Sequence, residues 1–410
     1  MSELRIWLEG EHIGNLSRAR GTLVFTHTAY AIATATARPL VSVAMPVRRA
    51  PYRGDVVAAF FDGLLPEGEA RRMLAHDFDV DTDDAYGMLE RIGRDCAGAL
   101  EVLTATATPT DVAGAPELLT DAQVAARLAA LRSVPLGIDE RVRVSLPGVQ
   151  EKLVLSSTPE GWALPLDGRP STHILKPAHP FLPRTVVNEA FCLAIARHAG
   201  VSVAAAQLHD FGAGPVLVIE RFDRTPSPLV RRIHQEDLCQ ATGTSTRHKY
   251  EALGGPSLQR VAQLLQLWTR GEASLRRLLD IAVLNVALGN ADAHAKNLSI
   301  AYDADGRIEL APAYDLMCTR AYEQVETTAG MFVNDVQQID QVSREDLIAE
   351  GASWGLDAAS VAEQVDALLQ RLPAAVVAAS SELAVPTDIH DVVARRVEQF
   401  STDGRLSAQQ

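Results

Sequence analysis

The N-terminal hundred residues alternate between apolar patterns that predict short strands and patterns that predict helices. A period of two is typical of a half-buried strand, and apolar positions three and four apart are typical of a helix. A turn at Glu9–Glu11 joins the first strand to the next one. These patterns predict a small α/β subdomain over residues 1–105. Its predicted strands are Leu4–Leu8, Leu23–Phe25 and Leu40–Val43, and its predicted helices are Val56–Leu65 and Ala85–Ile92.

The next two hundred residues begin with a linker and continue as strands and helices. Residues 103–122 are rich in Ala, Thr and Pro, which predicts a linker, and with a connecting helix it occupies residues 106–140. A strand-rich part follows over residues 141–235. Its predicted elements are a strand at Val142–Val144, a turn at Pro147–Gly148, strands at Lys152–Leu155, Thr172–Lys176 and Gly214–Glu220, and a helix at Val187–Ala199 that Gly200 ends.

The remaining residues, 236–410, are predicted to be mostly helical. The clearest helical patterns are Leu275–Leu288 and Val361–Leu372. The chain as a whole is therefore expected to be α+β.

Composition narrows the classes of protein further. The chain has 410 residues, of which 47% are hydrophobic and 22% charged, as in ordinary globular proteins. Its net charge of −14 argues against a self-sufficient DNA-binding surface. Its four cysteines lie far apart and predict neither a disulfide framework nor a zinc ribbon. No signal peptide or membrane-spanning run is visible, so we expect a cytoplasmic protein without a membrane partner.

The sharpest cluster of polar residues is Gly289–Asn297 (GNADAHAKN), between an apolar helix pattern and a short predicted strand at Leu298–Ile300. Asp292 and Asn297 stand five apart, as Asp and Asn do in the catalytic loop of protein kinases. There the Asp accepts the proton of the attacking hydroxyl and the Asn holds magnesium. Asp315 follows eighteen residues after Asn297 and is a candidate second ligand. One Asp, one Asn and the phosphates of ATP suit Mg²⁺.

Two other interpretations of this segment stay open. Asn290 and Asp292 are common turn residues, and His294 is compatible with a packed core histidine, so the segment could be a capped loop without chemistry. The other interpretation is a transition-metal site through Asp292, His294 and Asp315. The further His ligands that such a site needs are not clustered nearby.

A kinase needs further parts upstream, in a fixed order, and each has a candidate. Ser145–Lys152 (SLPGVQEK) places a glycine between two strands, with backbone N–H groups that can cover phosphate, although it matches no standard glycine-rich motif. Lys176, at the end of a strand, can neutralise phosphates, and Glu189 on the next helix can orient it. Val218–Phe222 can present backbone groups to adenine. Each feature alone is ordinary, and their order favours a kinase.

The segments that carry these residues resemble the HipA family, the serine/threonine-kinase toxins of bacterial type II toxin–antitoxin modules. The resemblance covers essentially the whole chain. Besides GNADAHAKN and SLPGVQEK, the matching segments are AYDL (Ala313–Leu316), THILK (Thr172–Lys176), VIERFDR (Val218–Arg224), HQEDLCQATG (His234–Gly243), KYE and GGP within Lys249–Pro256, ARPLVSVAMP (Ala37–Pro46), FFDGLLPEG (Phe60–Gly68) and RIGRDCAGAL (Arg91–Leu100).

The resemblance implies a role for each matching residue. Asp292 would be the general base, and Asn297 and Asp315 would hold Mg²⁺. The Gln235–Asp237 segment would support the active site. Residues that would bind ATP are Lys176, the covering loop Pro147, Gly148, Val149, Gln150, Glu151 and Lys152, the adenine hinge Glu220, Arg221 and Phe222, and His294 with Lys296 beside the γ-phosphate.

Ser145 aligns with the serine that family members phosphorylate on themselves. A phosphate adds about −1.5 to −2 charges at neutral pH, which would repel a bound triphosphate, eject the loop and stop the kinase. An ordinary serine between strand and turn is the alternative. The chain departs from the family at Leu146–Pro147, where smaller residues are frequent and where proline removes one N–H donor.

The family pattern is not visible after Pro386. Arg395, Arg396 and Arg405 are candidates for DNA contacts in an operator complex, but we favour a solvated helix face.

These observations together predict a two-lobed, protein-kinase-like core with a small N-terminal α/β subdomain and a mostly helical C-terminal lobe. The expected reaction is transfer of the ATP γ-phosphate to a protein Ser or Thr. The resemblance implies an aminoacyl-tRNA synthetase of the glutamyl type as the target and a helix-turn-helix antitoxin of the HipB type as the partner, through which operator DNA is bound.

Two alternatives remain at this point. One is a non-enzymatic kinase-like scaffold that binds such an antitoxin as a co-repressor. The joint presence of Lys176, Asp292, Asn297 and Asp315 disfavours it. The other is a kinase of small molecules or lipids, which no basic amphipathic helix supports.

Overall fold

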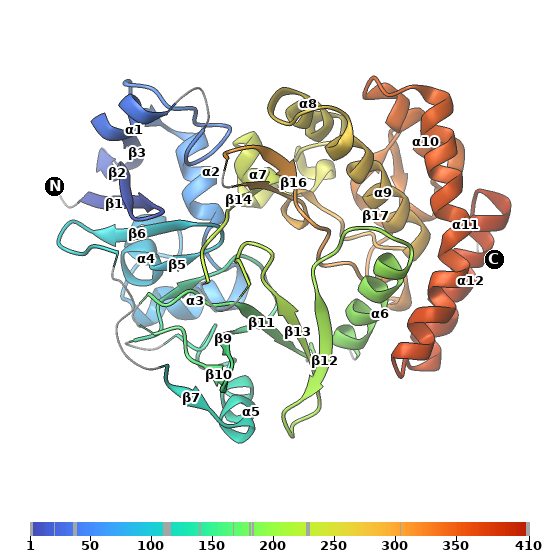
Figure 1. Ribbon diagram of the computed structural model, residues 1–410, viewed down its shortest axis with the longest axis horizontal. Coiled ribbons are helices and arrows are strands. Elements are labelled where there is room, and N and C mark those ends of the chain that lie inside the picture. Colours follow the sequence, from blue (N-terminus) through green and yellow to red (C-terminus); the bar gives the residue numbers. More distant parts are fainter. Residues whose placement is uncertain are drawn as a thin grey trace. The chain divides into compact units, whose positions relative to one another are not determined.

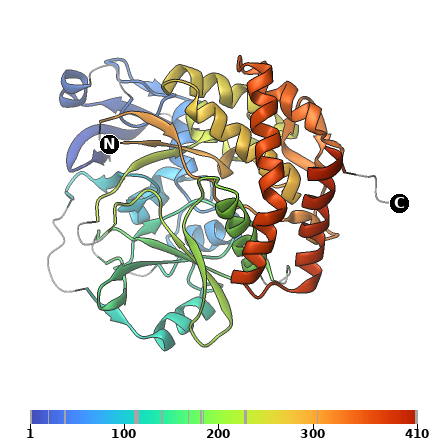
Figure 2. The same ribbon diagram turned by 45° about the vertical axis from the view of Figure 1, so that its right-hand side comes forward.

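The computed structural model divides into two compact units (Figure 1 and Figure 2). Unit 1 contains residues 1–177, 209–247 and 301–306, and unit 2 contains residues 178–208, 248–300 and 307–410. These boundaries differ from the predicted segments, because residues 178–208 belong with the helical unit. The residues that the structure describes are 3–19, 21–35, 39–109, 116–138, 141–166, 168–179, 182, 184–226, 230–303 and 305–406. Residues 110–115 and 139–140 of the predicted linker lie outside them.

The N-terminal part of unit 1 contains a five-stranded antiparallel sheet of order β4-β3-β2-β1-β6. The predicted strands at Leu4–Leu8 and Leu23–Phe25 are confirmed. The predicted turn is also confirmed, with Glu9 and Gly10 in the left-handed region. The strands are β1 (Glu3–Leu8), β2 (Glu11–Ala19), β3 (Thr22–His27), β4 (Tyr52–Arg53) and β6 (Leu100–Thr104).

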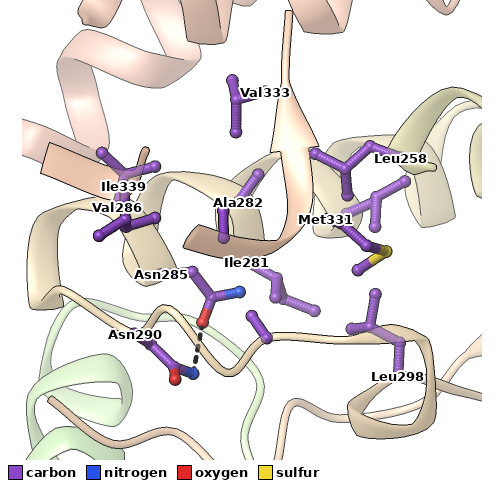
Figure 3. A pocket seen from close by; sticks show the side chains of 13 residues that line it. Leu258, Ile281, Ala282, Asn285, Val286, Asn290, Leu298, Met331, Val333 and Ile339 are labelled. Atoms are coloured by element: carbon purple, nitrogen blue, oxygen red, sulfur yellow. Dashed lines mark hydrogen bonds between the residues drawn. The ribbon is translucent and has the colours of Figure 1, made fainter. Parts of the chain in front are cut away.

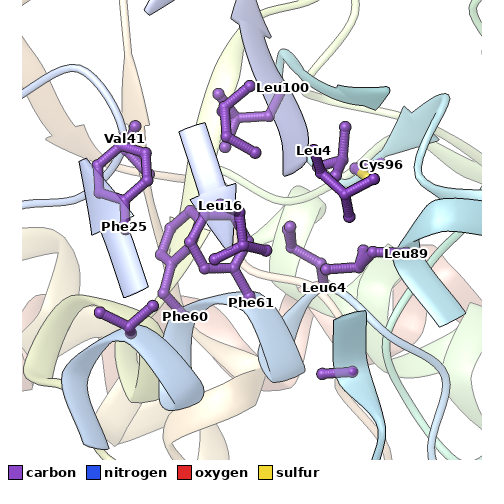
Figure 4. Packing of buried hydrophobic residues seen from close by; sticks show 14 of the residues in the cluster. Leu4, Leu16, Phe25, Val41, Phe60, Phe61, Leu64, Leu89, Cys96 and Leu100 are labelled. Carbon is purple, nitrogen blue, oxygen red and sulfur yellow. The ribbon is translucent and has the colours of Figure 1, made fainter. Parts of the chain in front are cut away.

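The apolar faces of four helices and this sheet form the first core of unit 1 (Figure 4). Phe25 of the sheet and Phe60 and Phe61 of α2 are fully buried there, together with Leu4 and Leu16. The two predicted helices of this part are confirmed as α2 and α4. The four helices are α1 (Ala29–Thr34), α2 (Asp55–Gly63), α3 (Gly68–Asp77) and α4 (Ala85–Ile92).

The strand predicted at Leu40–Val43 is wrong. Its backbone groups bond to side chains instead of a neighbouring strand: the carbonyl of Val41 bonds to the ring Nε2 of His234 at 2.9 Å, and the N–H of Val43 donates to Glu236 at 2.9 Å. An apolar run is therefore held in irregular conformation by two buried polar residues.

The second sheet of unit 1 has the order β12-β13-β11-β9-β10-β7, and β12 enters unit 1 at His209. Helix α5 packs on it over a second apolar core that includes Val124, Leu153 and Leu155. The strand predicted at Val142–Val144 is shorter than expected and lies at β8 (Val144–Ser145), parallel to β5 (Asp95–Cys96). The other elements are β7 (Leu118–Leu119), α5 (Asp121–Ala129), β9 (Leu153–Thr158), β10 (Gly161–Ala163), β11 (His173–Pro177), β12 (Ala206–Asp210) and β13 (Pro215–Glu220).

Charged side chains are also buried in unit 1. Arg224 pairs with Asp95 at 2.9 Å, and Arg221 pairs with Asp223 at 2.7 Å. The Arg224–Asp95 pair connects the N-terminal subdomain to the segment that follows β13. The whole set, called the Asp95 network below, consists of Asp95, Glu101, Arg221, Asp223, Arg224 and Arg232.

The Gln235–Asp237 segment has a structural role in unit 1. It lies in β14 (His234–Asp237), and Asp237 caps α7 (Leu238–Thr242) through a capping box with Gln240. Gln240 also donates to the carbonyl of Phe60 at 2.9 Å. The buried Glu236 accepts from Val43 and from the hydroxyl of Tyr302.

Unit 2 is mostly helical, as predicted for the C-terminal part, and α11 contacts α6, α9, α10 and α12 (Figure 1). Its helices are α6 (Thr185–His198), α8 (Leu258–Trp268), α9 (Ala273–Leu288), α10 (Arg344–Ser353), α11 (Ala358–Glu382) and α12 (Thr387–Asp403). Short strands and 3₁₀ turns complete the region after residue 245: η1 (Thr246–His248), η2 (Glu251–Leu253), η3 (Ala295–Asn297), β15 (Ser299–Tyr302), β16 (Ile308–Leu310), η4 (Thr319–Ala321), β17 (Thr328–Val333), β18 (Val336–Gln338) and η5 (Ile339–Gln341).

The prediction of a solvated face is wrong for Arg396 of α12. This residue is only 6% exposed, pairs with Asp340 at 2.5 Å and donates to the carbonyl of Val286 at 3.2 Å. Arg395 and Arg405 are exposed, as expected. Along the described ranges, no helix combines the length and apolar character that a bilayer crossing needs.

Candidate active site

The predicted catalytic loop begins where α9 ends. Gly289 takes the left-handed conformation, with φ of 74°, and turns the chain out of the helix. Three hydrogen bonds then fix the loop. The N–H of Ala291 donates to the hydroxyl of Thr319 at 2.9 Å, and this hydroxyl donates to the carbonyl of Gly289 at 3.0 Å. The N–H of Gly330 donates to the carbonyl of Ala291 at 2.7 Å. The backbone around Asp292 is therefore held in place.

Asp292 and Asn297 lie together in this loop. The side-chain amide of Asn297 donates to the backbone carbonyl of Asp292 at 3.0 Å, and the hydroxyl of Tyr250 donates to Oδ1 of Asp292 at 2.6 Å. Within the described ranges, Oδ2 of Asp292 and the amide oxygen of Asn297 accept no hydrogen bond. One carboxylate oxygen and one amide oxygen are thus left as acceptors, which fits a proton acceptor beside a magnesium ligand.

His294 is buried next to both predicted acidic residues. Burial lowers the pKa of His294, the charges of Asp292 and Asp315 oppose this shift, and Lys249 adds to it. The ring packs edge-on against Tyr250, with centroids 4.9 Å apart and planes at 82°. Its Nδ1 has no hydrogen-bond partner among the residues that the structure describes.

Asp315 stands in the left-handed region, with φ of 58°. This conformation is costly for a residue with a side chain, although Asp tolerates it better than most, and such residues cluster at functional sites. The preceding Tyr314 bonds to the hydroxyl of Ser299 at 2.7 Å and donates to the carbonyl of Lys296 at 2.9 Å. These bonds attach the Asp315 segment to the catalytic loop.

Sequence reasoning missed Tyr250 as a member of the site. It lies in the KYE segment, whose resemblance to the family was visible but whose role was not. The carbonyl of Lys249 accepts from the N–H of Ala295 at 3.2 Å, and Glu251 accepts from the N–H of Phe332 at 2.6 Å. The segment is therefore bonded on both sides of Tyr250.

The predicted nucleotide loop begins with two buried residues of unit 1. The hydroxyl of Ser145 donates to the carbonyl of Leu64 at 2.7 Å, and the side chain is fully buried. Leu146 packs into the second apolar core. The departure from the family pattern at Leu146 thus provides an apolar anchor for the loop.

The turn of this loop keeps donors available for an anion. Gly148 has φ of 109°, and a Cβ there would lie 2.6 Å from Nζ of Lys152. Lys152 donates to the carbonyl of Pro147. Across the part of the chain that the structure describes, the N–H groups of Gly148, Val149 and Gln150 have no acceptor. Consecutive N–H groups of this kind fit a phosphate.

The remaining predicted nucleotide residues lie on β11 and at the end of β13. Lys176 is buried in β11, opposite Leu217. Glu220 is exposed and Phe222 half-buried. Arg221 has a different task from the predicted one: its N–H donates to the carbonyl of Thr172 at 2.9 Å, and its guanidinium belongs to the Asp95 network. The hinge prediction therefore rests on Glu220 and Phe222.

A small cavity lies behind the catalytic loop in unit 2 (Figure 3). Its volume of about 20 Å³ has room for about one water molecule and is far too small for a nucleotide. Apolar side chains such as Ile281, Val286 and Met331 line it, and at one end Asn290 donates to Asn285 at 3.0 Å.

Clusters of three or more His, Cys, Asp or Glu side chains able to hold a metal are absent from the described ranges. The predicted magnesium shell would not form such a cluster, because it contains one Asp and one Asn.

Family models match most of the chain. The model described as the HipA N-terminal domain matches residues 4–103, and the one described as the HipA-like C-terminal domain matches residues 144–378.

Individual relatives agree with the family models. The Sinorhizobium fredii protein Y4mE, which carries the name of a kinase, is 36% identical over 337 residues, covering 80% of each chain. The serine/threonine-protein kinase toxin HipA of Shewanella oneidensis is 29% identical over 335 residues, covering 78% of this chain and 76% of the relative. A solved structure of Shewanella oneidensis HipA with HipB and operator DNA has a TM-score of 0.83 and 27% identity, covering 97% of this chain and 96% of the other.

Proposed function

Because the chain belongs to the HipA family of serine/threonine kinases, we propose that it is the toxin of a toxin–antitoxin module and phosphorylates a protein needed for translation. Its fold and its relatives' names identify it as a kinase. Asp292 then acts as the general base, and Asn297 and Asp315 hold the magnesium ion. The observation that carries this proposal is that one oxygen of Asp292 and the amide oxygen of Asn297 accept no hydrogen bond from the described residues, in a loop fixed by backbone hydrogen bonds.

The reaction joins a substrate hydroxyl oxygen to the γ-phosphorus of ATP. The bond from the γ-phosphorus to the β,γ-bridging oxygen breaks and ADP leaves, while the hydroxyl proton passes to Oδ2 of Asp292. Asn297 and Asp315 would hold Mg²⁺, which would supply neutralisation of the phosphate charge. Lys176 binds the α- and β-phosphates, and His294 and Lys296 lie beside the γ-phosphate.

The covering loop and hinge bind the rest of the nucleotide in this proposal. The N–H groups of Gly148–Gln150 contact phosphate, with Pro147, Glu151 and Lys152 shaping the loop. The backbone of Glu220 and Phe222 contacts adenine.

Phosphorylation of Ser145 would inactivate such a kinase. The Ser145 hydroxyl is fully buried and donates to Leu64, so a phosphate with about −1.5 to −2 charges has no place in this conformation. The loop has to leave its site to be modified and cannot return afterwards. Intact-mass measurement after incubation with ATP should show one phosphate on the wild type and none on Ser145→Ala. Equal incorporation into both proteins would contradict this proposal.

The target that we propose is a glutamyl-tRNA synthetase, whose inactivation would stop translation in the cytoplasm. Brief induction of the wild type followed by phosphoproteomics should reveal the modified protein, with Asp292→Asn as the matched inactive control. A purified bacterial glutamyl-tRNA synthetase should then incorporate ³²P from ATP with the wild type only. Transfer by Asp292→Asn at the wild-type rate would refute the assignment of the base.

A helix-turn-helix antitoxin of the HipB type is the partner that we propose, because the similar Shewanella oneidensis structure contains HipB and operator DNA. The net charge of −14 supports DNA binding mainly through that partner. Gel-shift measurements at 150 mM salt should show operator binding by the chain with antitoxin and none by the chain alone. Binding by the chain alone would contradict the proposal.

A further inference from the structure

Tyr250 lies against the catalytic loop, in a segment to which the mechanism above assigns no role. Its hydroxyl donates to Oδ1 of Asp292 at 2.6 Å, and its ring packs edge-on against His294. We infer that Tyr250 is a positioning residue, which holds the carboxylate of Asp292 in the orientation that accepts the substrate proton. This inference rests on the proposed role of Asp292 as the general base.

The carboxylate of Asp292 needs such a partner because its backbone bonds do not fix it. The amide of Asn297 holds the carbonyl of Asp292, but the torsion that turns a carboxylate about its last bond is broad and roughly two-fold. Across the described residues, the hydroxyl of Tyr250 is the one side-chain donor to this carboxylate. It engages Oδ1 and so leaves Oδ2 for the substrate hydroxyl.

Tyr250 can position its partner because the turn that carries it is itself fixed. The preceding carbonyl accepts from Ala295 of the catalytic loop at 3.2 Å, and the following Glu251 accepts from Phe332 of β17 at 2.6 Å. The N–H of Gly255 donates to the carbonyl of Tyr250 at 2.9 Å, and a Cβ at Gly255 would approach that oxygen to 2.7 Å. The phenol ring therefore extends from a rigid turn, and its packing on His294 limits its movement.

Replacement of Tyr250 by Phe separates positioning from packing. Phe keeps the ring against His294 and removes only the hydroxyl. We expect kcat to fall because Asp292 spends less time in the reactive orientation, and misplacement of a reacting group by about 1 Å costs on the order of 100-fold. The KM for ATP should not change, because the residues proposed to bind the nucleotide are intact.

The matched control is Tyr322→Phe, which removes another hydroxyl from unit 2. Tyr322 accepts a long hydrogen bond of 3.4 Å from Asn188, whose amide also donates to the carbonyl of Cys318 at 2.9 Å. The amide of Asn188 therefore keeps an acceptor, the carbonyl of Cys318, when this hydroxyl is removed.

The experiment measures ADP formation by the full-length chain with Mg²⁺, ATP and a purified bacterial glutamyl-tRNA synthetase. ADP formation counts phosphate passed to any acceptor. Tyr250→Phe should lower kcat roughly 10- to 100-fold at unchanged KM for ATP and unchanged Tm, while Tyr322→Phe behaves as the wild type. Added to Asp292→Asn, the Tyr250→Phe change should not lower the residual kcat further, because no general base remains to be oriented.

Two results would overturn the inference: a wild-type kcat for Tyr250→Phe, or a loss of kcat that appears only together with a lower Tm. Both leave the proposed kinase function standing. An inactive wild type would count instead against the proposed function itself, so the two failures are distinguishable.

Discussion

Replacement of Asp95 by Asn tests whether the Asp95 network holds unit 1 together. Asp95 is fully buried, and its carboxylate accepts from Arg224 at 2.9 Å and from both the hydroxyl and the N–H of Ser171, at 2.5 and 3.1 Å. The charges of Arg224, Arg221 and Arg232 lower the pKa of Asp95 far below its usual range, against the opposing effect of burial. The ionised form is therefore the one that the fold contains.

The amide of Asn cannot replace this carboxylate. Asp95 uses one oxygen for Arg224 and the other for Ser171, and all of these partners are donors. An amide has a single oxygen, so either orientation places its NH₂ group against a donor. The network also changes from three positive and three negative groups to three positive and two negative ones. Breaking a buried pair in this way costs about 3–5 kcal/mol.

Urea unfolding of the full-length chain checks this magnitude. The free energy of unfolding of unit 1 should fall by about 3–5 kcal/mol in Asp95→Asn. For a unit of roughly 200 residues, this corresponds to a loss of roughly 6–20 °C in Tm. The control is Glu69→Gln, which removes an ion pair with Arg72 whose side chains are 70% and 63% exposed. It should change the free energy by less than about 0.5 kcal/mol. A change in Asp95→Asn as small as that of the control would refute the reasoning.

Two further predictions concern Glu236 and Gly330. Burial raises the pKa of Glu236 from 4.5 to about 7, so between these pH values the folded chain keeps a proton that the unfolded chain has lost, and the free energy of unfolding should fall as pH rises. Urea unfolding from pH 5 to pH 8 should show that the free energy of unfolding of the wild type falls by at most about 3 kcal/mol relative to that of Glu236→Gln. The same pH dependence in both proteins would contradict this prediction. A Cβ on Gly330 would lie 2.6 Å from backbone atoms of Ala293 and His294, so Gly330→Ala should displace the catalytic loop. Steady-state kinetics should show a kcat that is roughly 10- to 100-fold lower. An unchanged kcat would show that the loop adapts.

The local elements around the site were predictable because short-range patterns determine them. The apolar run Leu275–Leu288 predicts a buried helix, Gly289 predicts its end, and a helix does end there. The strand predicted at Thr172–Lys176 is also present, as β11. The five-residue spacing of Asp292 and Asn297 then brings the side chain of Asn297 to the backbone carbonyl of Asp292 within one loop.

The partners across long sequence distances were not predictable in this way. Tyr250 and Asp292 are 42 residues apart, and Asp340 and Arg396 are 56 apart. A single sequence contains no signal that pairs residues so far apart. Arg396 of α12 was therefore expected on the surface. The prediction of a strand at Leu40–Val43 was wrong for the same reason, because the side chains that bond to its backbone lie 193 residues away.

These long-range contacts also change the view of the N-terminal subdomain. The predicted organisation treats residues 1–105 as an accessory part joined by a linker, yet they provide the carbonyl that binds Ser145 and two of the three carboxylates of the Asp95 network. Without them, Arg221, Arg224 and Arg232 would share the single carboxylate of Asp223. Inside the folded unit, the carboxylates of the subdomain compensate arginine charges that would be costly to bury unpaired. The subdomain is therefore part of the structure that holds the proposed nucleotide loop and pairs the buried arginines of unit 1.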